Sequence, residues 1–143
     1  MKKKLNCVLL IDDDLGTNFI NQIFIKKANI TDNIQTVLNG KEAIDFITNK
    51  GKYEKVGNIF AQPMLTLLDI NMPVMDGWEF LEAYKNLEVY QKGQIVIVML
   101  TTSLNLDDKK RAENISDVSG FKNKPLTLQI IEDIMQKHFP DYL

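Results

Sequence analysis

The stretch from residue 64 to residue 80 constrains the fold of this chain more than any other. It begins with an apolar run, MLTLL, of the length expected for a strand that is buried on both faces. The run ends at Asp69, after which Pro73 and the pair Asp76-Gly77 indicate a loop. From Trp78 onward the apolar spacing is that of a helix. This order places a carboxylate at the carboxyl end of a parallel strand, where open α/β folds bind ligands.

Short apolar runs and amphipathic segments alternate in the same way along the rest of the chain. Strands are expected at residues 5–11, 34–38, 64–68, 94–100 and 118–122. Helices are expected at residues 15–28 and 41–49, from 78, after a cap at Asp107 or Asp108, and from a cap at Thr127 to about 138. Residues 50–62 are expected to form a long loop. Five strand–helix repeats predict an α/β fold with a doubly wound parallel five-stranded sheet and helices on both faces.

Two further expectations concern which residues face the core. In the helix at residues 15–28, spacings of three and four predict an inner face formed by Ile20, Ile23, Phe24 and the stem of Lys27. Lys122 lies inside the last expected strand, and a lysine there is typical of a strand at the edge of a sheet.

Length and composition limit the kinds of protein that this chain can be. Its 143 residues suit one domain spanning 1–143, and its net charge of −2 offers no basic excess for a nucleic acid. A single cysteine, Cys7, excludes an internal disulfide bond. No apolar run is long enough for a transmembrane helix. We therefore expect a cytoplasmic monomer or weak dimer with neither a nucleic acid nor a membrane as partner.

Polar residues stand where the expected strands end. Asp12 and Asp13 follow the first strand, Asp69 the third, Thr101 the fourth and Lys124 the fifth. Because the carboxyl ends of parallel strands share one edge of a sheet, these side chains can converge. Grouped carboxylates repel one another without a cation, and their oxygen atoms suit Mg²⁺. With a lysine and a hydroxyl nearby, such a site could accept a phosphoryl group on Asp69.

These same residues carry a resemblance to a known family. The chain resembles the receiver domain of bacterial response regulators, the phosphoproteins of two-component (phosphorelay) signal transduction, over essentially its whole length. Among receivers it is most similar to small single-domain types with an extended loop before the third strand. The matching segments are Leu10-Ile11-Asp12-Asp13, Leu68-Asp69-Ile70-Asn71-Met72-Pro73 with Asp76-Gly77, Leu100-Thr101-Thr102 and Lys124-Pro125.

The resemblance implies a role for each matching residue. Asp69 would be the phosphoacceptor, and Mg²⁺ would be held by Asp12, Asp13, Asp69 and the backbone carbonyl of Asn71. Lys124 would pair with the acceptor or the phosphoryl group, and its bond to Pro125 would be cis. Thr101 and Phe121 would form the switch, although the family more often has tyrosine in place of Phe121.

The resemblance also implies an architecture and partners. The fold would be flavodoxin-like with strand order 2-1-3-4-5, and a receiver alone would carry no output domain. The phosphoryl donor would be a histidine kinase or a histidine phosphotransfer protein, and a downstream protein would read the switched surface. The chain would catalyse only its own phosphorylation and dephosphorylation. Because Phe19 and Ile25 fall outside the expected inner face of the first helix, they are expected to form an apolar docking patch for the donor.

Two alternatives use similar residues. A Mg²⁺-dependent haloacid-dehalogenase-like phosphatase also has a nucleophilic Asp, but it needs an Asp two residues later as general acid. Asn71 occupies that place and cannot deliver a proton. A receiver-like scaffold that is never phosphorylated would be expected to lack the acidic pair, the acceptor or the lysine, and this sequence has all of them.

Overall fold

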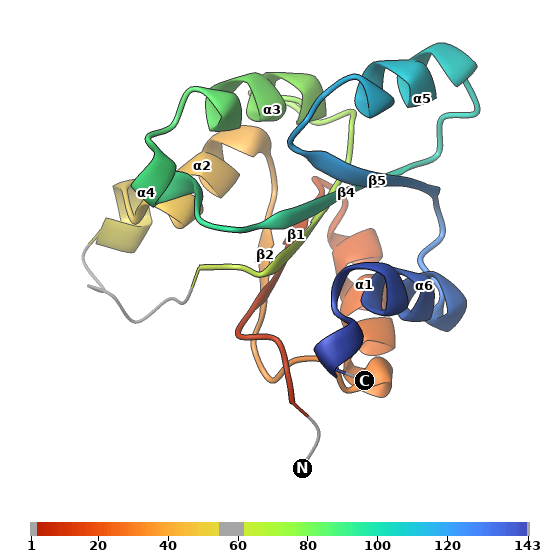
Figure 1. Ribbon diagram of the computed structural model, residues 1–143. Helices are drawn as coiled ribbons and strands as arrows, with labels where there is room; N and C mark the ends of the chain where they lie inside the picture. The colour runs from red at the N-terminus through yellow and green to blue at the C-terminus, as the bar shows by residue number, and fades with distance from the viewer. Residues whose placement is uncertain (1–2, 55–61, 143) are drawn as a thin grey trace.

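The computed structural model describes residues 3–54 and 62–142 and shows a five-stranded parallel sheet in the order β2-β1-β3-β4-β5 (Figure 1). The predicted fold class and strand order are therefore confirmed. The strands are β1 (Val8–Ile11), β2 (Ile34–Val37), β3 (Leu65–Leu68), β4 (Val96–Thr101) and β5 (Val118–Asn123). All residues of β1 and β3 are buried, as their continuous apolar runs predict, whereas β2 and β5 lie at the edges and are partly exposed. Lys122 is thus in an edge strand, as expected.

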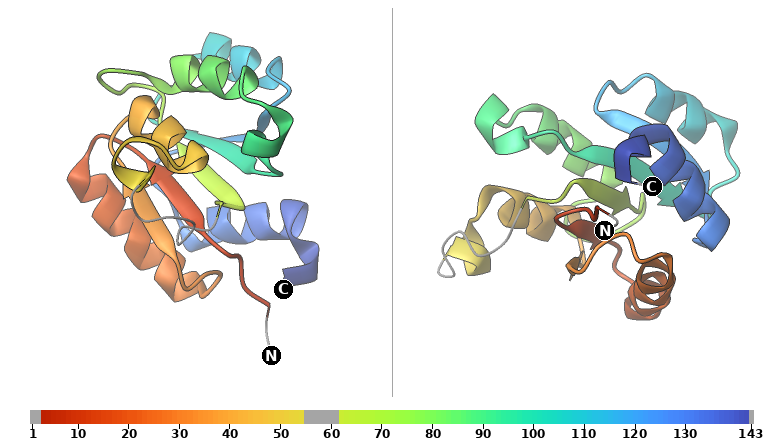
Figure 2. Two further views of the ribbon diagram at one scale, coloured as in Figure 1. Left: turned by 90° about the vertical axis from the view of Figure 1, so that its left-hand side faces the viewer. Right: turned by 60° about the horizontal axis from the view of Figure 1, so that its bottom comes forward.

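The helices form one layer on each face of the sheet (Figures 1 and 2). They are α1 (Leu15–Ala28), α2 (Gly40–Thr48), α3 (Gly77–Lys85), α4 (Val89–Lys92), α5 (Leu106–Glu113) and α6 (Leu128–His138), followed by a 3₁₀ turn at Pro140–Tyr142. One hydrophobic core lies between the sheet and α2, α3 and α5, and we call it the α2/α3/α5 core. A second core lies between the sheet and α1 and α6, and we call it the α1/α6 core.

Side-chain caps determine where several helices begin. Asp14 caps α1, Thr127 caps α6 as predicted, and Asp76 forms a capping box with Glu79 at α3. The cap of α5 is Asn105, so the expectation of Asp107 or Asp108 is wrong. An N-cap residue has extended backbone outside the helix, whereas both aspartates lie in the first turn of α5. Their negative charges there interact favourably with the positive end of the helix dipole.

The buried face of α1 matches the predicted one only at Phe24, which packs partly buried against the α1/α6 core. Ile20 is 52% exposed and Ile23 is 39% exposed, whereas Ile25 is only 1% exposed and packs in the α1/α6 core. The expectation that Ile25 contributes to an exposed patch is therefore wrong. Two asparagines, Asn18 and Asn21, share the buried face with Ile25. The sequence pattern favoured the most apolar face of the helix, but the sheet and α6 cover a neighbouring one.

Smaller differences concern lengths and a missed element. The first strand begins at Val8, and Leu5 makes only an isolated bridge with Thr31. The short helix α4 was not predicted. Residues 51–54 form a 3₁₀ turn at the start of the expected long loop. Most of the remainder of that loop, residues 55–61, lies outside the described residues.

Candidate functional site

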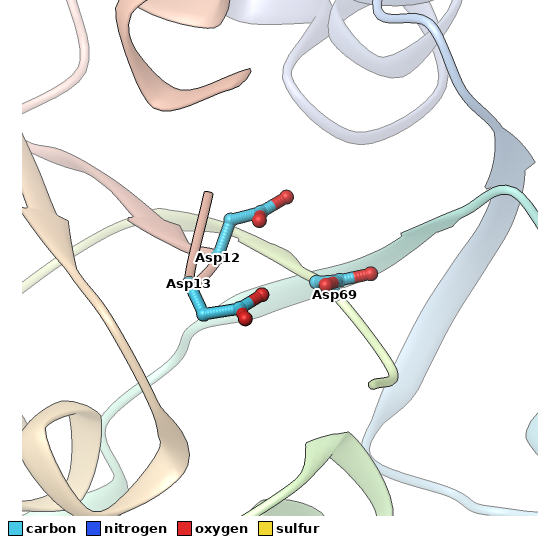
Figure 3. Close-up of side chains that lie close together, drawn as sticks. All are labelled: Asp12, Asp13 and Asp69. Atoms are coloured by element: carbon cyan, nitrogen blue, oxygen red, sulfur yellow. The ribbon is translucent and has the colours of Figure 1, made fainter. Parts of the chain in front are cut away.

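Three carboxylates meet at one edge of the sheet. Ile11 pairs with Leu68 in neighbouring strands, so Asp12 and Asp69 leave the sheet side by side, and Asp13 follows directly. One carboxylate oxygen from each of the three lies within 4.8 Å of the others (Figure 3). Asp12 is 4% exposed and Asp69 8% exposed, while Asp13 is open to solvent. The predicted convergence of these strand ends is therefore what the structure shows.

Lys124 reaches the same site from the end of β5. Its Nζ lies 2.6 Å from Asp12 Oδ2 and 3.2 Å from Asp69 Oδ1. Its backbone N–H donates to the carbonyl of Thr101 at 2.8 Å, which ties the end of β5 to the end of β4. The bond between Lys124 and Pro125 is cis, as the family resemblance implied. A single ammonium group therefore bridges two of the three carboxylates.

The charges of the three carboxylates and Lys124 together favour an additional cation at this site. Burial raises the pKa of Asp69, and the nearby charge of Asp12 raises it further, although Lys124 acts in the opposite direction. Burial by itself would lower the pKa of Lys124, but its hydrogen bond to Asp12 and the charge of Asp69 raise it overall. Because one ammonium faces three carboxylates, the site has an excess of negative charge that a divalent cation would neutralise.

The loop after Asp69 returns the chain very close to the acceptor strand. The N–H of Gly77 donates to the carbonyl of Ile70 at 2.7 Å. A Cβ atom at residue 77 would lie 2.5 Å from the carbonyl oxygen of Asp69, so only glycine fits without displacing backbone. The sequence indicated a turn at this glycine but not the close approach. Asn71 lies within this loop with an exposed side chain.

Thr101 is the last residue of β4 and is 1% exposed. Its Oγ1 accepts a hydrogen bond from the backbone N–H of Ser103 at 3.0 Å. Phe121 pairs with Met99 in the neighbouring strand and packs partly buried against the α2/α3/α5 core. Since side chains alternate along strands, Thr101 and Phe121 face the same side of the sheet.

The loop between β4 and α5 contains a hydrogen-bond network that the sequence did not reveal. Ser103 Oγ donates to Asp108 Oδ2 at 2.7 Å and accepts from the N–H of Asn105 at 3.2 Å. The carbonyl of Ser103 accepts from Asn123 Nδ2 at 2.9 Å. The sequence shows polar residues after β4, but their partner in β5 could not be deduced from it. Ser103 therefore connects the end of β4, α5 and β5.

An apolar surface borders the site on the α1 side. Phe19 is 65% exposed and Ile20 52% exposed, which confirms an exposed apolar side chain at Phe19. A hollow of about 290 Å³ between α1 and the β5–α6 loop is lined in part by Ile20, Leu126 and Lys124.

Among residues 3–54 and 62–142, no helix has the length and hydropathy needed to cross a membrane.

Comparisons with known proteins agree with this geometry. Residues 8–136 match the family model described as the response regulator receiver domain. The chain is 27% identical to sporulation initiation phosphotransferase F of Bacillus subtilis over 134 residues, covering 93% of each protein. The crystal structure of a two-component response regulator from Cytophaga hutchinsonii is 31% identical, with a TM-score of 0.80 over 94% of this chain and 97% of that one. The Mn²⁺-bound form of response regulator Rcp1 is 27% identical, with a TM-score of 0.73 over 96% of both chains.

Proposed function

Since this chain belongs to the response regulator receiver domain family, we propose that it accepts a phosphoryl group on Asp69 from a histidine kinase or a histidine phosphotransfer protein. The observation that carries the proposal is the position of the Asp69 carboxylate. It lies with Asp12 and Asp13 at the carboxyl edge of the sheet and contacts Lys124 at 3.2 Å. In the reaction, an Asp69 oxygen attacks phosphorus, the N–P bond of the donor phosphohistidine breaks, and the donor imidazole leaves.

The donor set of the site fits a hard divalent cation. Asp12, Asp13 and Asp69 offer carboxylate oxygens within 4.8 Å of one another, and the backbone carbonyl of Asn71 would complete the set. We propose Mg²⁺ as the resident ion. When bound, it neutralises charge on the oxygens of the transferring group. Lys124 would also neutralise charge on the transferring group, because its ammonium can leave Asp12 and bond a phosphoryl oxygen.

Thr101 and Phe121 are proposed to convert phosphorylation into a change of surface. The Thr101 hydroxyl can donate to a phosphoryl oxygen on Asp69, a charge-assisted bond that only the modified state offers. As Thr101 moved toward the phosphoryl oxygen, Phe121 would move inward into the space that it leaves. The surface formed by α5, β5 and α6 would be read by a downstream protein. Such a chain acts as a switch that catalyses only its own phosphorylation and dephosphorylation.

The exposed apolar side chain of Phe19 is proposed to contact the phosphoryl donor. It lies on α1, the helix that follows Asp12 and Asp13, so a donor that approaches Asp69 would meet it. Phe19→Ala should leave phosphorylation by acetyl phosphate unchanged and slow transfer from the cognate kinase. Unimpaired transfer from that kinase would exclude Phe19 from the docking surface.

Mass spectrometry after incubation with acetyl phosphate and Mg²⁺ tests the central proposal. The wild-type chain should gain one hydroxylamine-labile phosphoryl group, and Asp69→Asn should gain none, because an amide is not a competent nucleophile. Asp13→Ala should retain the fold and bind Mg²⁺ more weakly in a calorimetric titration. An Asp69→Asn chain that is labelled at the wild-type rate would rule out the acceptor assignment.

A further inference from the structure

Asn18 is a buried polar residue of α1 that contacts the backbone of the acidic site. It lies in the first turns of α1 and is 3% exposed. Its side-chain Nδ2 donates to the backbone carbonyl of Asp12 at 2.8 Å, and its backbone N–H donates to the carbonyl of Asp14 at 3.0 Å. The residue therefore links α1 to the peptide that joins Asp12 to Asp13.

That peptide controls how the Asp13 carboxylate is oriented relative to the other two. Beyond the end of β1, the carbonyl of Asp12 accepts from Asn18, while the Asp12 N–H still donates to the carbonyl of Val37 at 3.1 Å. The Asp12 carboxylate is held separately, by the N–H of Asp14 at 2.9 Å and by Lys124 at 2.6 Å. Rotation of the 12–13 peptide plane would change ψ of Asp12 and φ of Asp13. It would therefore move the Asp13 side chain relative to its neighbours.

The bonding of the Asn18 amide indicates which of its atoms matters. Its Nδ2 is bonded, whereas its Oδ1 is buried and has no hydrogen-bond partner among the described residues. A buried polar atom without a partner costs stability, so an apolar residue would suit this position better if only packing counted. An apolar residue, however, could not donate a hydrogen bond to the Asp12 carbonyl, as Asn18 Nδ2 does.

We propose that Asn18 is a positioning residue for the cation site. Its amide holds the Asp12–Asp13 peptide in the orientation in which the Asp13 carboxylate converges with those of Asp12 and Asp69. The inference deepens the proposed function, since it assumes that this site binds Mg²⁺ for phosphoryl transfer. Asn18 itself acts only through the backbone of the residues that would hold the ion.

Two substitutions separate the lost donor from the lost volume. Asn18→Ala removes the donor and leaves a cavity, whereas Asn18→Leu removes the donor and fills the space with apolar atoms. The matched control is Asn21→Ala, because Asn21 is 5% exposed on the same helix and makes no hydrogen bond to the acidic residues within the described part of the chain. Calorimetric titration with Mg²⁺ gives the affinity, and thermal unfolding without Mg²⁺ gives the stability of each variant.

Both Asn18 variants should bind Mg²⁺ about tenfold more weakly than the wild type, the usual effect of removing a group that orients a metal ligand. Their melting temperatures should differ from each other, whereas their Mg²⁺ affinities should not. Asn21→Ala should lower the melting temperature and keep the wild-type affinity. Wild-type affinity in Asn18→Leu, or an equal loss in Asn21→Ala, would overturn the inference. Failure of acetyl phosphate to label the wild type, with the Asn18 effect on Mg²⁺ intact, would instead refute the phosphoacceptor role alone.

Discussion

The helices α5 and α6 lie on opposite faces of the sheet beside β5, and different kinds of contact hold them there (Figure 1). Helix α6 buries Ile131, Ile134 and Met135 and packs along α1. Helix α5 buries only Ala112. Burial of large apolar side chains stabilises a helix far more than burial of one methyl group, so the two helices differ in how firmly the core holds them.

Polar contacts replace the missing apolar ones on α5. Asp108 accepts from Ser103 Oγ at 2.7 Å, and the Arg111 guanidinium lies 4.2 Å from the centre of the Trp78 ring. Each such contact contributes about 0.5–1.5 kcal/mol and exchanges readily with water. Since the loop before α5 begins directly after Thr101, the helix that is easier to displace is also the one next to the proposed switch residue. We therefore expect a new bond from Thr101 to a phosphoryl oxygen to displace α5 more readily than α6.

The largest expected difference between the helices is in their contribution to stability. Ile134→Ala in α6 should lower the free energy of unfolding by about 2–5 kcal/mol, since it leaves a cavity in the α1/α6 core. Ala112→Gly, the corresponding truncation in α5, should cost about 1 kcal/mol, mainly through helix propensity. Urea denaturation of both variants measures the two values. Equal losses would show that α5 is anchored as firmly as α6.

Thr101→Ala should remove the response of α5 to phosphorylation while leaving Asp69 able to be phosphorylated. The hydroxyl is the group that gains a bond in the modified state, and a population shift requires such a differential contact. Amide NMR spectra with and without beryllofluoride should show shifts at α5 and Phe121 in the wild type only. The buried face of α6 should change little in either protein. Wild-type shifts at Phe121 in the variant would contradict the coupling.

Ser103→Ala should loosen α5 without phosphorylation. The change removes the hydroxyl that donates to Asp108 and accepts from Asn105, so local opening of α5 should become easier by about 0.5–1.5 kcal/mol. Hydrogen exchange of the α5 amides measures the effect. The matched change in α6 is Thr127→Ala, which removes the cap bond to the N–H of Ile130. Faster exchange there should be confined to the first turn, because the apolar face retains the rest of the helix.

The smallest expected effect concerns pH and the end of α6. Burial lowers the pKa of His138, and the charges of Lys137 and Lys122 lower it further, so the folded state favours the neutral imidazole. The unfolded state then binds the proton more readily. The contribution of His138 to the free energy of unfolding is therefore fully present above its ordinary pKa of 6.5. It is lost as the pH falls through the lowered pKa. Urea denaturation between about pH 7.5 and about pH 5 should show a slightly shallower pH dependence for His138→Gln than for the wild type. Identical slopes would mean that His138 does not contribute.

The sheet and the residues at its functional edge could be predicted from the sequence alone. Fully apolar runs with abrupt polar ends fit strands that are buried on both faces, so the polar residues after them could be assigned to strand ends. These residues are Asp12, Asp69, Thr101 and Lys124. The cap at Thr127 and the edge position of β5 also follow from local chemistry. All of these features depend on residues that are close together in the chain, and a pattern within one segment is enough to reveal them.

Which face of α1 is buried, and what binds its polar residues, depends instead on the packing of distant segments. Ile25 is in the core and Phe19 is in solvent, although both are large and apolar. Asn18 is buried because the carbonyl of Asp12 offers it an acceptor, and Ser103 becomes a junction because Asn123 reaches it from β5. Helical periodicity ranks the faces of a helix by hydropathy, but it carries no information about where the neighbouring elements lie. A buried polar side chain is stable only through such partners, and the fold alone brings them within reach.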